Sequence, residues 1–382
     1  MQKKLIVLAI AGLSGAAFAQ SNVTISGQMD IGFDNISATG CSAAGCANLT
    51  SRNRVVDNNS NLRFSGTEKL GNGMEAWFQI ESAIGTSDNV GTTGAQTTGV
   101  ATSTGVGTRN TAVGLRGNWG SVLIGKWDIY YSTLAPVDAS GLANGLAMGT
   151  SSLDILFTNN GANSGGGRFN NVVMYSTPNF NGFSADIAYS TSSANEVTTP
   201  AVDKESNVFL NPKYSNGPIA VFYAYLKRSD VGNAAAGTSP DAKFNRAGAA
   251  YTLPMGLKFG LIWDTNSTTT AAGVETKRTA WAFPVSYTMG QHAFNFTYAK
   301  ANNSNVGGAD VANTNAKMTM LGYTYSLSKR TSLGLSWTSI NNDSAAKYDL
   351  WHPSSSATVQ SAAGLPAGAD PRQVSLNVKH SF

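Results

Sequence analysis

Apolar and polar side chains alternate along much of the chain with a period of two residues. Phe294, Phe296 and Tyr298 share one face of such a segment, and Asn295 and Thr297 lie on the opposite face. A period of two is the pattern of a β-strand. Each alternating segment has about ten residues, the length that a tilted strand needs to cross a bilayer. The pattern recurs at 281–287, 321–327 and 333–337.

The last ten residues, 373–382, alternate without interruption. Val374, Leu376, Val378, His380 and Phe382 share one face. Lipid-facing and lumen-facing side chains of a membrane β-strand alternate in this way. An edge strand of a soluble β-sandwich has the same period, but a chain that ends on the final aromatic residue of such a strand is more typical of a membrane barrel.

Two kinds of connection separate the alternating segments, and they take turns along the chain. Seven are tight and carry turn residues: 70–73, 117–120, 178–182, 215–218, 254–256, 288–290 and 328–329. Eight are long and rich in Gly, Ser, Thr, Asn and Ala: 36–59, 83–107, 128–167, 191–205, 229–242, 265–276, 302–314 and 343–370. Short turns at one end and long loops at the other are typical of a transmembrane barrel.

Fifteen connections join sixteen strands, which predicts an all-β, 16-stranded antiparallel transmembrane β-barrel. The expected strands are 22–35, 60–69, 74–82, 108–117, 120–127, 170–177, 183–190, 206–215, 219–228, 243–253, 257–264, 277–288, 291–301, 315–327, 330–342 and 371–382. Closure needs every strand, so residues 20–382 form one domain. A barrel of this size encloses an aqueous channel rather than a filled core.

The first nineteen residues have the layout of a secretory signal peptide. Lys3 and Lys4 precede the apolar run 5–13, and Ala17 and Ala19 form a cleavage site with small residues. The run is too short for a membrane anchor, because a hydrocarbon core is about 30 Å thick. The mature chain is therefore expected to begin at Gln20.

Composition agrees with an exported membrane protein. Without Lys3 and Lys4, 24 basic residues face 22 acidic ones, since the whole chain has 26 and 22. This near balance gives no reason to expect nucleic acid as a partner. Charged residues make up 13% of the chain, about half the share usual for a soluble domain, which suits an outer surface that meets lipid.

Cys41 and Cys46 are the only cysteines, and they lie in a polar, Gly-rich segment. Export permits a disulfide between them, and free thiols are the alternative. No histidine lies near, so a metal site is not expected there.

Two features resemble catalytic motifs, but neither indicates a catalytic site. The segment 120–126 fits Gly-x-x-x-x-Gly-Lys, but it lacks the final Ser or Thr and is itself an alternating strand, so phosphate binding is not expected. His292, His352 and His380 are scattered without carboxylates at ligand spacing. We therefore expect neither an enzyme nor any cofactor or metal.

A series of short motifs, taken in order, resembles the trimeric general porins of Gram-negative β-proteobacteria, the Neisseria, Burkholderia and Comamonas type. The resemblance covers essentially the whole chain. The motifs are Val-Thr-Ile-Ser-Gly at 23–27, Phe-Ser-Gly-Thr-Glu-Lys-Leu-Gly-Asn-Gly at 64–73, Phe-Gln-Ile-Glu at 78–81, Val-Gly-Leu-Arg-Gly at 113–117, Arg-Phe-Asn-Asn at 168–171, Tyr-Ser-Thr-Pro-Asn-Phe-Asn-Gly-Phe at 175–183, Tyr-Ser-Leu-Ser-Lys-Arg-Thr at 325–331 and Lys-His-Ser-Phe at 379–382.

The resemblance implies that the third long loop, 128–167, folds inward and narrows the pore. This loop contains three acidic residues and no Lys or Arg: Asp128, Asp138 and Asp154. The acids would then oppose basic residues on the wall, and Arg109 and Arg168 match arginines of the family. Opposed charges across a narrow lumen set selectivity.

The chain departs from the family pattern at one position of the wall. Asn61 stands where the family has a third arginine. Arg63 can substitute for it, because Leu62 and Phe64 are expected to face lipid and Arg63 therefore faces the lumen. Arg52 and Arg54, in the first long loop, are expected near the mouth.

Function follows from these expectations. The chain is expected to be an outer-membrane general-diffusion porin that passes small hydrophilic solutes and ions, with a mild preference for anions. A substrate-specific channel is the alternative, and an adhesin role of the long loops is also left open. The resemblance further implies a homotrimer in outer-membrane lipid, and recognition of Phe382 by the barrel-assembly machinery.

Overall fold

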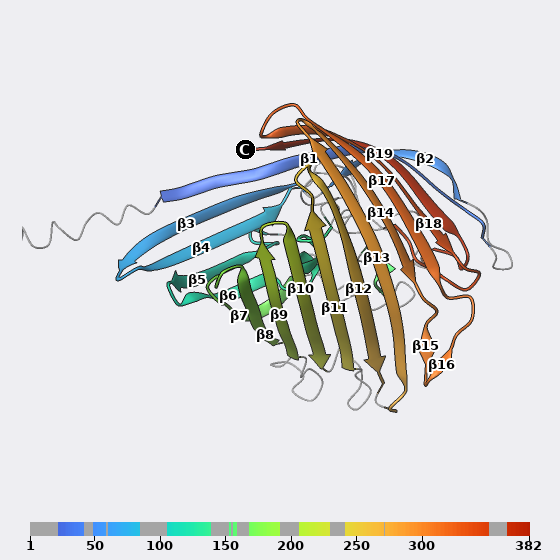
Figure 1. Ribbon diagram of the computed structural model, residues 1–382, viewed down its shortest axis with the longest axis horizontal. Helices are drawn as coiled ribbons and strands as arrows, with labels where there is room; N and C mark the ends of the chain where they lie inside the picture. Colours follow the sequence, from blue (N-terminus) through green and yellow to red (C-terminus); the bar gives the residue numbers. More distant parts are fainter. Residues whose placement is uncertain are drawn as a thin grey trace, which may run out of the picture.

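The computed structural model describes residues 22–41, 49–58, 60–84, 105–138, 153, 156–158, 168–191, 206–229, 241–270, 272–350 and 365–382. The expected signal peptide, 1–19, and the start of the mature chain lie outside the described residues. Almost all of the described residues belong to one antiparallel sheet (Figure 1).

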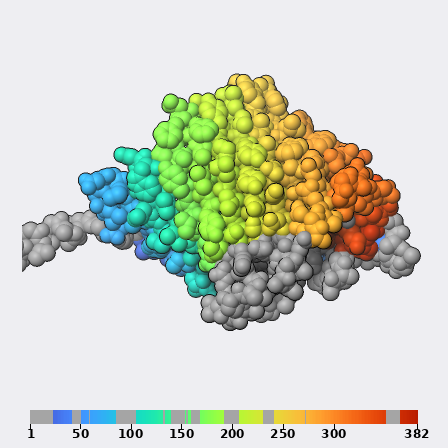
Figure 2. Space-filling model, turned by 90° about the horizontal axis from the view of Figure 1, so that it is seen from below, coloured from blue at the N-terminus to red at the C-terminus, as the bar shows by residue number. Residues whose placement is uncertain are grey.

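The strands of this sheet follow one another in chain order around the molecule. Their bounds are β1 Asn22–Thr39, β2 Leu49–Asp57, β3 Asn61–Gly71, β4 Met74–Ala83, β5 Thr111–Gly117, β6 Gly120–Asp128, β7 Arg168–Ser176, β8 Phe183–Thr191, β9 Ser206–Asn216, β10 Ile219–Ser229, β11 Asp241–Thr252, β12 Leu257–Thr269, β13 Glu275–Met289, β14 His292–Ala301, β15 Asn305–Val306, β16 Ala309–Asp310, β17 Ala316–Ser326, β18 Thr331–Asn342 and β19 Asp370–Ser381. The space-filling view shows the same order as a continuous change of colour across the wall (Figure 2).

The sheet closes on itself through its first and last strands. β1 pairs with β19 from Gln28 opposite Ser381 to Thr39 opposite Asp370, and the two strands lie side by side in Figure 1. The sheet is therefore a barrel, and closure removes the exposed edges that an open sheet would present.

In the part of the chain that the structure describes, sixteen strands form the wall of the barrel, as the sequence predicts. β3 pairs with the first part of β1, and β2 pairs with its second part, so the two together form one wall strand interrupted at 58–60. β15 and β16 form a small hairpin within the connection from β14 to β17. Subtracting this hairpin and counting β2 with β3 reduces the nineteen strands of the sheet to sixteen.

The first long loop is shorter than the predicted 36–59, because β1 continues to Thr39 and β2 begins at Leu49. The outward residues of this strand pair are mostly polar and bond one another: the Asn35 side-chain amide donates to Ser51 Oγ and Asn53 Oδ1, both at 2.7 Å. An alternation of apolar and polar residues cannot reveal a strand pair that is polar on its outer face. The prediction of a loop was therefore wrong over most of this segment.

β19 shows how the residues divide between the two faces of the wall. The apolar residues Val374, Leu376 and Val378 are 45%, 56% and 49% exposed, whereas the polar Gln373, Ser375 and Asn377 are 1%, 0% and 1% exposed. A soluble protein buries its apolar residues instead. Exposed apolar and enclosed polar positions are the distribution of a barrel whose outer face meets lipid.

All seven tight connections lie between paired strands, where the sequence predicts them. The turn from β3 to β4 shows the reason, since Asn72 and Gly73 have φ of 50° and 75°. Asn and Gly are the residues that adopt this left-handed region most readily. The long connections begin at the opposite ends of the strands, so the two ends of the barrel differ.

One short helix, η1 Tyr131–Leu134, follows β6. Within the described residues, no helix is long and apolar enough to cross a membrane.

Candidate pore constriction

Two arginines and one glutamate meet at the inner wall. Arg63 on β3 is opposite Glu81 on β4 in the strand register, and its Nη2 and Nε lie 2.8 Å and 3.2 Å from Glu81 Oε2. Arg109 precedes β5, and its Nε donates to the other carboxylate oxygen, Oε1. The Glu81 side chain is only 3% exposed. A buried carboxylate needs such partners, because burial of an unpaired charge is costly.

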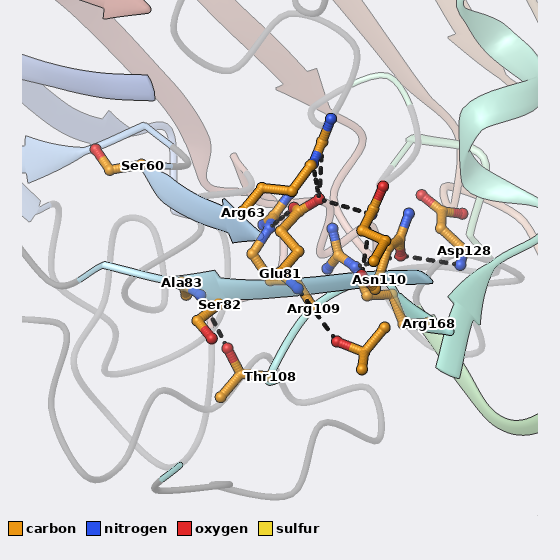
Figure 3. Close-up of polar contacts among 12 residues, drawn as sticks. Ser60, Arg63, Glu81, Ser82, Ala83, Thr108, Arg109, Asn110, Asp128 and Arg168 are labelled. Carbon is orange, nitrogen blue, oxygen red and sulfur yellow. Dashed lines mark hydrogen bonds and ion pairs between the residues drawn. The ribbon is translucent and has the colours of Figure 1, made fainter. Parts of the chain in front are cut away.

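The segment that carries Arg109 is held beside β4 by hydrogen bonds. The Arg109 amide donates to the Glu81 carbonyl at 2.9 Å. The Ala83 amide donates to Thr108 Oγ1 at 2.9 Å, and the Gly107 amide donates to Ser82 Oγ at 2.8 Å. These bonds extend the β4–β5 pairing beyond the end of β5 and fix the position of the Arg109 guanidinium (Figure 3).

Arg168 joins the same group through Asn110. Its Nε donates to Asn110 Oδ1 at 2.9 Å, and the Asp128 amide donates to the same oxygen at 3.1 Å. The Gln79 side-chain amide donates to the Asn110 carbonyl at 3.0 Å and to Glu81 Oε2 at 3.3 Å. A chain of polar contacts therefore links Arg168 to Glu81, and Figure 3 shows the residues together. We call Arg63, Glu81, Arg109, Asn110, Asp128 and Arg168 the arginine cluster.

The described part of the third long connection contacts the inner wall at a different place. Lys258 Nζ donates to the Pro136 carbonyl at 2.6 Å, Asn266 Nδ2 to the Phe157 carbonyl at 2.7 Å, and Arg278 Nε to the Thr158 carbonyl at 2.6 Å. The wall residues belong to β12 and β13, which are far along the sheet from β6 and β7. Apolar side chains of the same segment are buried in a cluster with wall residues: Ile129, Tyr130, Leu134, Val137, Leu153, Leu156 and Phe157.

A second charged group lies on the inner wall where this segment contacts it. Arg246 Nε and Arg278 Nη2 lie 2.8 Å and 3.2 Å from the two oxygens of Asp264. Both arginines are 1% exposed. The Arg246 guanidinium stacks over the Tyr130 and Phe157 rings, at 4.6 Å and 5.1 Å from their centroids. We call Arg246, Asp264 and Arg278 the buried triad, and it connects three wall strands to the third connection.

The predicted constriction residues fall into separate places. Arg63, Arg109 and Arg168 all belong to the arginine cluster, and Asp128 joins them through its backbone amide. Asp138 is buried with the segment against β12 rather than beside these arginines. Asp154 lies outside the described residues. Their roles in conduction remain predictions.

The arginines expected at the mouth lie in a strand. Arg52 and Arg54 belong to β2, and Arg54 Nη2 is 3.4 Å from Asp34 Oδ2. Their placement in the first loop was wrong, for the same reason that the loop was predicted too long. Cys41 is disulfide-bonded, and Cys46 lies outside the described residues, so the pairing of these two cysteines stays a prediction.

Neither Glu81 nor the buried triad was predicted to belong to a site. Glu81 is part of a family motif, and its spacing from Gln79 puts both residues on the inward face of β4. The triad had a comparable signal, since Arg246 and Arg278 occupy inward positions in strands of alternating pattern. A charge at an inward position of a membrane strand is a candidate pore residue.

The fold and these groups define a transmembrane β-barrel with charged side chains gathered on its inner wall. Comparison with known proteins gives the family. A family model described as Gram-negative porin matches residues 5–345. The chain therefore belongs to the Gram-negative porin family, whose members form pores in the outer membrane.

Individual relatives agree with this assignment. The chain is 28% identical over 391 residues to outer membrane porin protein 32 of Delftia acidovorans, with 100% of each chain covered. It is also 28% identical to an outer membrane porin protein of Bordetella pertussis, with 87% of this chain and 92% of that protein covered. The structure of the anion-selective porin from Comamonas acidovorans superposes with a TM-score of 0.69 at 23% identity, covering 95% of this chain and 100% of that one.

Proposed function

We propose that this porin is a general-diffusion pore with a mild preference for anions. The observation that carries the proposal is a surplus of positive charge in both groups at the inner wall. The arginine cluster has three arginines and two carboxylates, and the buried triad has two arginines and one carboxylate. A related porin of known structure is named anion-selective, which supports the sign of the preference.

The number of surplus positive charges sets how strongly the pore prefers anions to cations. Two unit charges 4 Å apart interact by about 1 kcal/mol in water. One or two surplus charges beside a hydrated pore therefore favour anions by a few-fold rather than exclude cations. The effect weakens at high salt, since the Debye length falls from about 10 Å at 0.1 M to about 3 Å at 1 M.

We further propose that the third long connection folds into the lumen as a whole and narrows the pore. The bonds from Lys258, Asn266 and Arg278 to its carbonyl groups support this, because they attach both described parts of the connection to wall strands distant from β6 and β7. The arginine cluster would then line the passage that remains. No catalytic step is part of this function.

The test is single-channel recording in planar bilayers of neutral lipid. Under a gradient of KCl we expect a reversal potential whose sign reports preferred chloride flux, and conductance that rises linearly with salt. A cation preference would refute the assignment of the arginine cluster. Saturation of flux by one solute, with competition from that solute, would favour a substrate-specific channel.

The assembly is a second part of the proposal. We propose a homotrimer in which the outer face near the two chain ends contacts neighbouring copies. Outward residues there are largely aliphatic, such as Val23, Ile25, Val113, Leu115 and Ile124, whereas exposed aromatic residues are frequent on the strands β8 to β14, such as Tyr189, Tyr223 and Trp263. A lipid-facing surface carries aromatic girdles, so the aliphatic part is the better protein contact. Cross-linking of unheated protein should give a trimer band.

We also propose how the chain matures, by cleavage of a signal peptide and recognition of its C-terminal residue. Cleavage after Ala19 would leave a mature chain that begins at Gln20, and the terminal Phe382 would be read by the barrel-assembly machinery. Phe382 is 41% exposed at the end of β19, where its amide and carbonyl bond the backbone of Gly27 at 3.1 Å. Deletion of Phe382 should lower the amount of folded protein in the membrane without changing the conductance of the channels that do form.

A further inference from the structure

Five lysines point outward from the wall at the end of the barrel that carries the long connections. They are Lys227 on β10, Lys243 on β11, Lys277 on β13, Lys300 on β14 and Lys317 on β17, and we call them the outward lysines. Their immediate neighbours show the direction. Lys300 lies between Ala299 and Ala301, which are both fully buried, and Lys317 lies between the buried Ala316 and Met318. Neighbours in a strand face opposite sides, so these lysines face away from the lumen.

The strand register places the outward lysines close to one another. Lys227 is opposite Lys243, and Lys243 is separated from Lys277 only by Ser267 on β12. Lys300 is opposite Lys317. Barrel strands are tilted relative to the barrel axis. Residues at one depth in the membrane are therefore offset in the register from one strand to the next. The outward lysines form such a belt along one side of the barrel.

Aromatic residues mark the depth of this belt. Trp281 is directly opposite Lys300 in the register, and its ring lies 5.5 Å from the Tyr298 ring. Trp263, opposite Trp281, is exposed on the outer face. Exposed Trp and Tyr are typical of the boundary between hydrocarbon and headgroups. Long connections of such barrels are extracellular, so the outward lysines lie at the headgroup level of the outer leaflet.

A polar hollow of about 720 Å³ opens beside three of the outward lysines. Lys277, Lys300 and Lys317 line it, and Thr279 and Asn302 add neutral hydrogen-bonding groups. Two carboxylates, Glu275 and Asp310, line it as well, and Asp310 accepts a bond from Asn305 Nδ2 at 2.9 Å.

Among the residues that the structure describes, none of the outward lysines forms an ion pair with a carboxylate. Their charges are therefore available to an anionic group from outside the chain.

We propose that the outward lysines bind the phosphate groups of an anionic glycolipid of the outer leaflet, with the hollow as the headgroup site. Like charges gathered at one depth repel one another, and phosphates between them remove this repulsion. Basic residues at a membrane surface attract anionic lipids, and the alkyl stems of lysine cover apolar surface while the ammonium groups remain at the headgroups. The proposal depends on the barrel's orientation in the outer membrane and not on its ion selectivity.

The experiment measures lipid binding to the full-length folded protein in neutral detergent by native mass spectrometry. The probe is bis-phosphorylated lipid A, and the comparison lipids are dephosphorylated lipid A and phosphatidylglycerol. We expect Lys300→Gln with Lys317→Gln to weaken binding of the phosphorylated probe about 30-fold, from about fivefold for each lysine at the surface. Lys317→Gln alone should give about a fifth of the wild-type affinity, which keeps the test open if the double variant folds poorly.

The matched control is Lys329→Gln with Arg330→Gln, which removes the same charge from the exposed turn between β17 and β18 at the opposite end of the barrel. This variant should bind the probe as the wild type does. Equal losses in both double variants would overturn the proposal, as would equal binding of dephosphorylated lipid A. Equally tight binding of phosphatidylglycerol would also overturn it, because the site would then recognise any anionic headgroup. Conductance in neutral bilayers should be unchanged in all variants, so failure here is distinguishable from failure of the proposed pore function.

Discussion

Arg109 contacts Glu81 twice: its amide donates to the Glu81 carbonyl at 2.9 Å, and its guanidinium donates to the Glu81 carboxylate. Arg63 occupies the second carboxylate oxygen, with Nη2 at 2.8 Å. One buried acid therefore holds two guanidinium groups together at the wall. Without it the two positive charges would repel each other at short range.

The first prediction concerns this acid. Glu81→Gln removes one negative charge and keeps the shape of the side chain, so the surplus of the arginine cluster rises by one. We expect the preference for anions to increase by up to about fivefold, from about 1 kcal/mol for a unit charge 4 Å from an ion in water. The reversal potential in a KCl gradient near 0.1 M measures it, and the change should shrink at 1 M because of screening.

A matched variant tests whether position matters as well as charge. Asp186→Asn also removes one carboxylate, but Asp186 pairs with Lys213 at 2.5 Å on β8 and β9, away from the arginine cluster. We expect a much smaller change in reversal potential. Equal changes in Glu81→Gln and Asp186→Asn would show that the arginine cluster has no special part in selectivity.

The second prediction concerns the buried triad. Asp264→Asn leaves Arg246 and Arg278 without their counter-charge, although both are 1% exposed. Removing one partner of a buried ion pair costs about 3–5 kcal/mol. We expect a lower free energy of unfolding in urea and a noisier, larger single-channel conductance, because the third connection loses part of its attachment.

The exposed pair gives the comparison for this effect. Asp186→Asn breaks the partly exposed pair with Lys213, for which a cost of up to about 1 kcal/mol is usual when such a pair lies at a surface. Arg278→Met gives a further check, since it leaves Arg246 and Asp264 balanced but removes the bond to the Thr158 carbonyl at 2.6 Å. If Arg278→Met leaves the conductance unchanged, the bond from Arg278 to Thr158 does not hold the third connection in place.

The third prediction concerns the two cysteines. A bond between Cys41 and Cys46 would make the oxidised protein about two daltons lighter than its reduced form and resistant to alkylation before reduction. Closing so short a loop stabilises by less than the roughly 3 kcal/mol of a 15-residue loop. Cys41→Ser with Cys46→Ser should therefore lower the free energy of unfolding only modestly. Alkylation of the unreduced, unfolded wild type would contradict the pairing.

The sequence predicts the number of strands because the lipid-facing pattern depends on each strand alone. Val374, Leu376 and Val378 are exposed whatever the neighbouring strands do. The continuation of β1 to Thr39 and the start of β2 at Leu49 were missed because the outward residues there are mostly polar, such as Ser51 and Asn53. Those residues are stabilised by bonds between the two strands, and the alternation of a single strand cannot reveal such bonds.

The same distinction applies to the site: the direction of a side chain could be predicted from one strand, but its partners could not. Arg63 was placed correctly on the inner face, because Leu62 and Phe64 fix the direction of β3. The partners of that arginine depend on the register between β3, β4 and the segment before β5, which brings Glu81 to Arg63 across 18 residues of chain and Arg109 to Glu81 across 28. The buried triad needs in addition the path of the third connection, which returns to strands more than a hundred residues away.

The fourth prediction uses a glycine on the wall to move the third connection. A Cβ at Gly260 on β12 would overlap Val137 Cγ1 of that connection, whereas a Cβ at Gly248 on β11 would overlap the Phe222 ring, which belongs to the wall. Both substitutions by alanine crowd a packed region, at a usual cost of about 1–3 kcal/mol. Only Gly260→Ala should displace the connection toward the lumen, so we expect it to lower single-channel conductance while Gly248→Ala does not. Equal conductance in the two variants, with similar losses in unfolding free energy, would mean that Val137 and its segment do not border the conducting path.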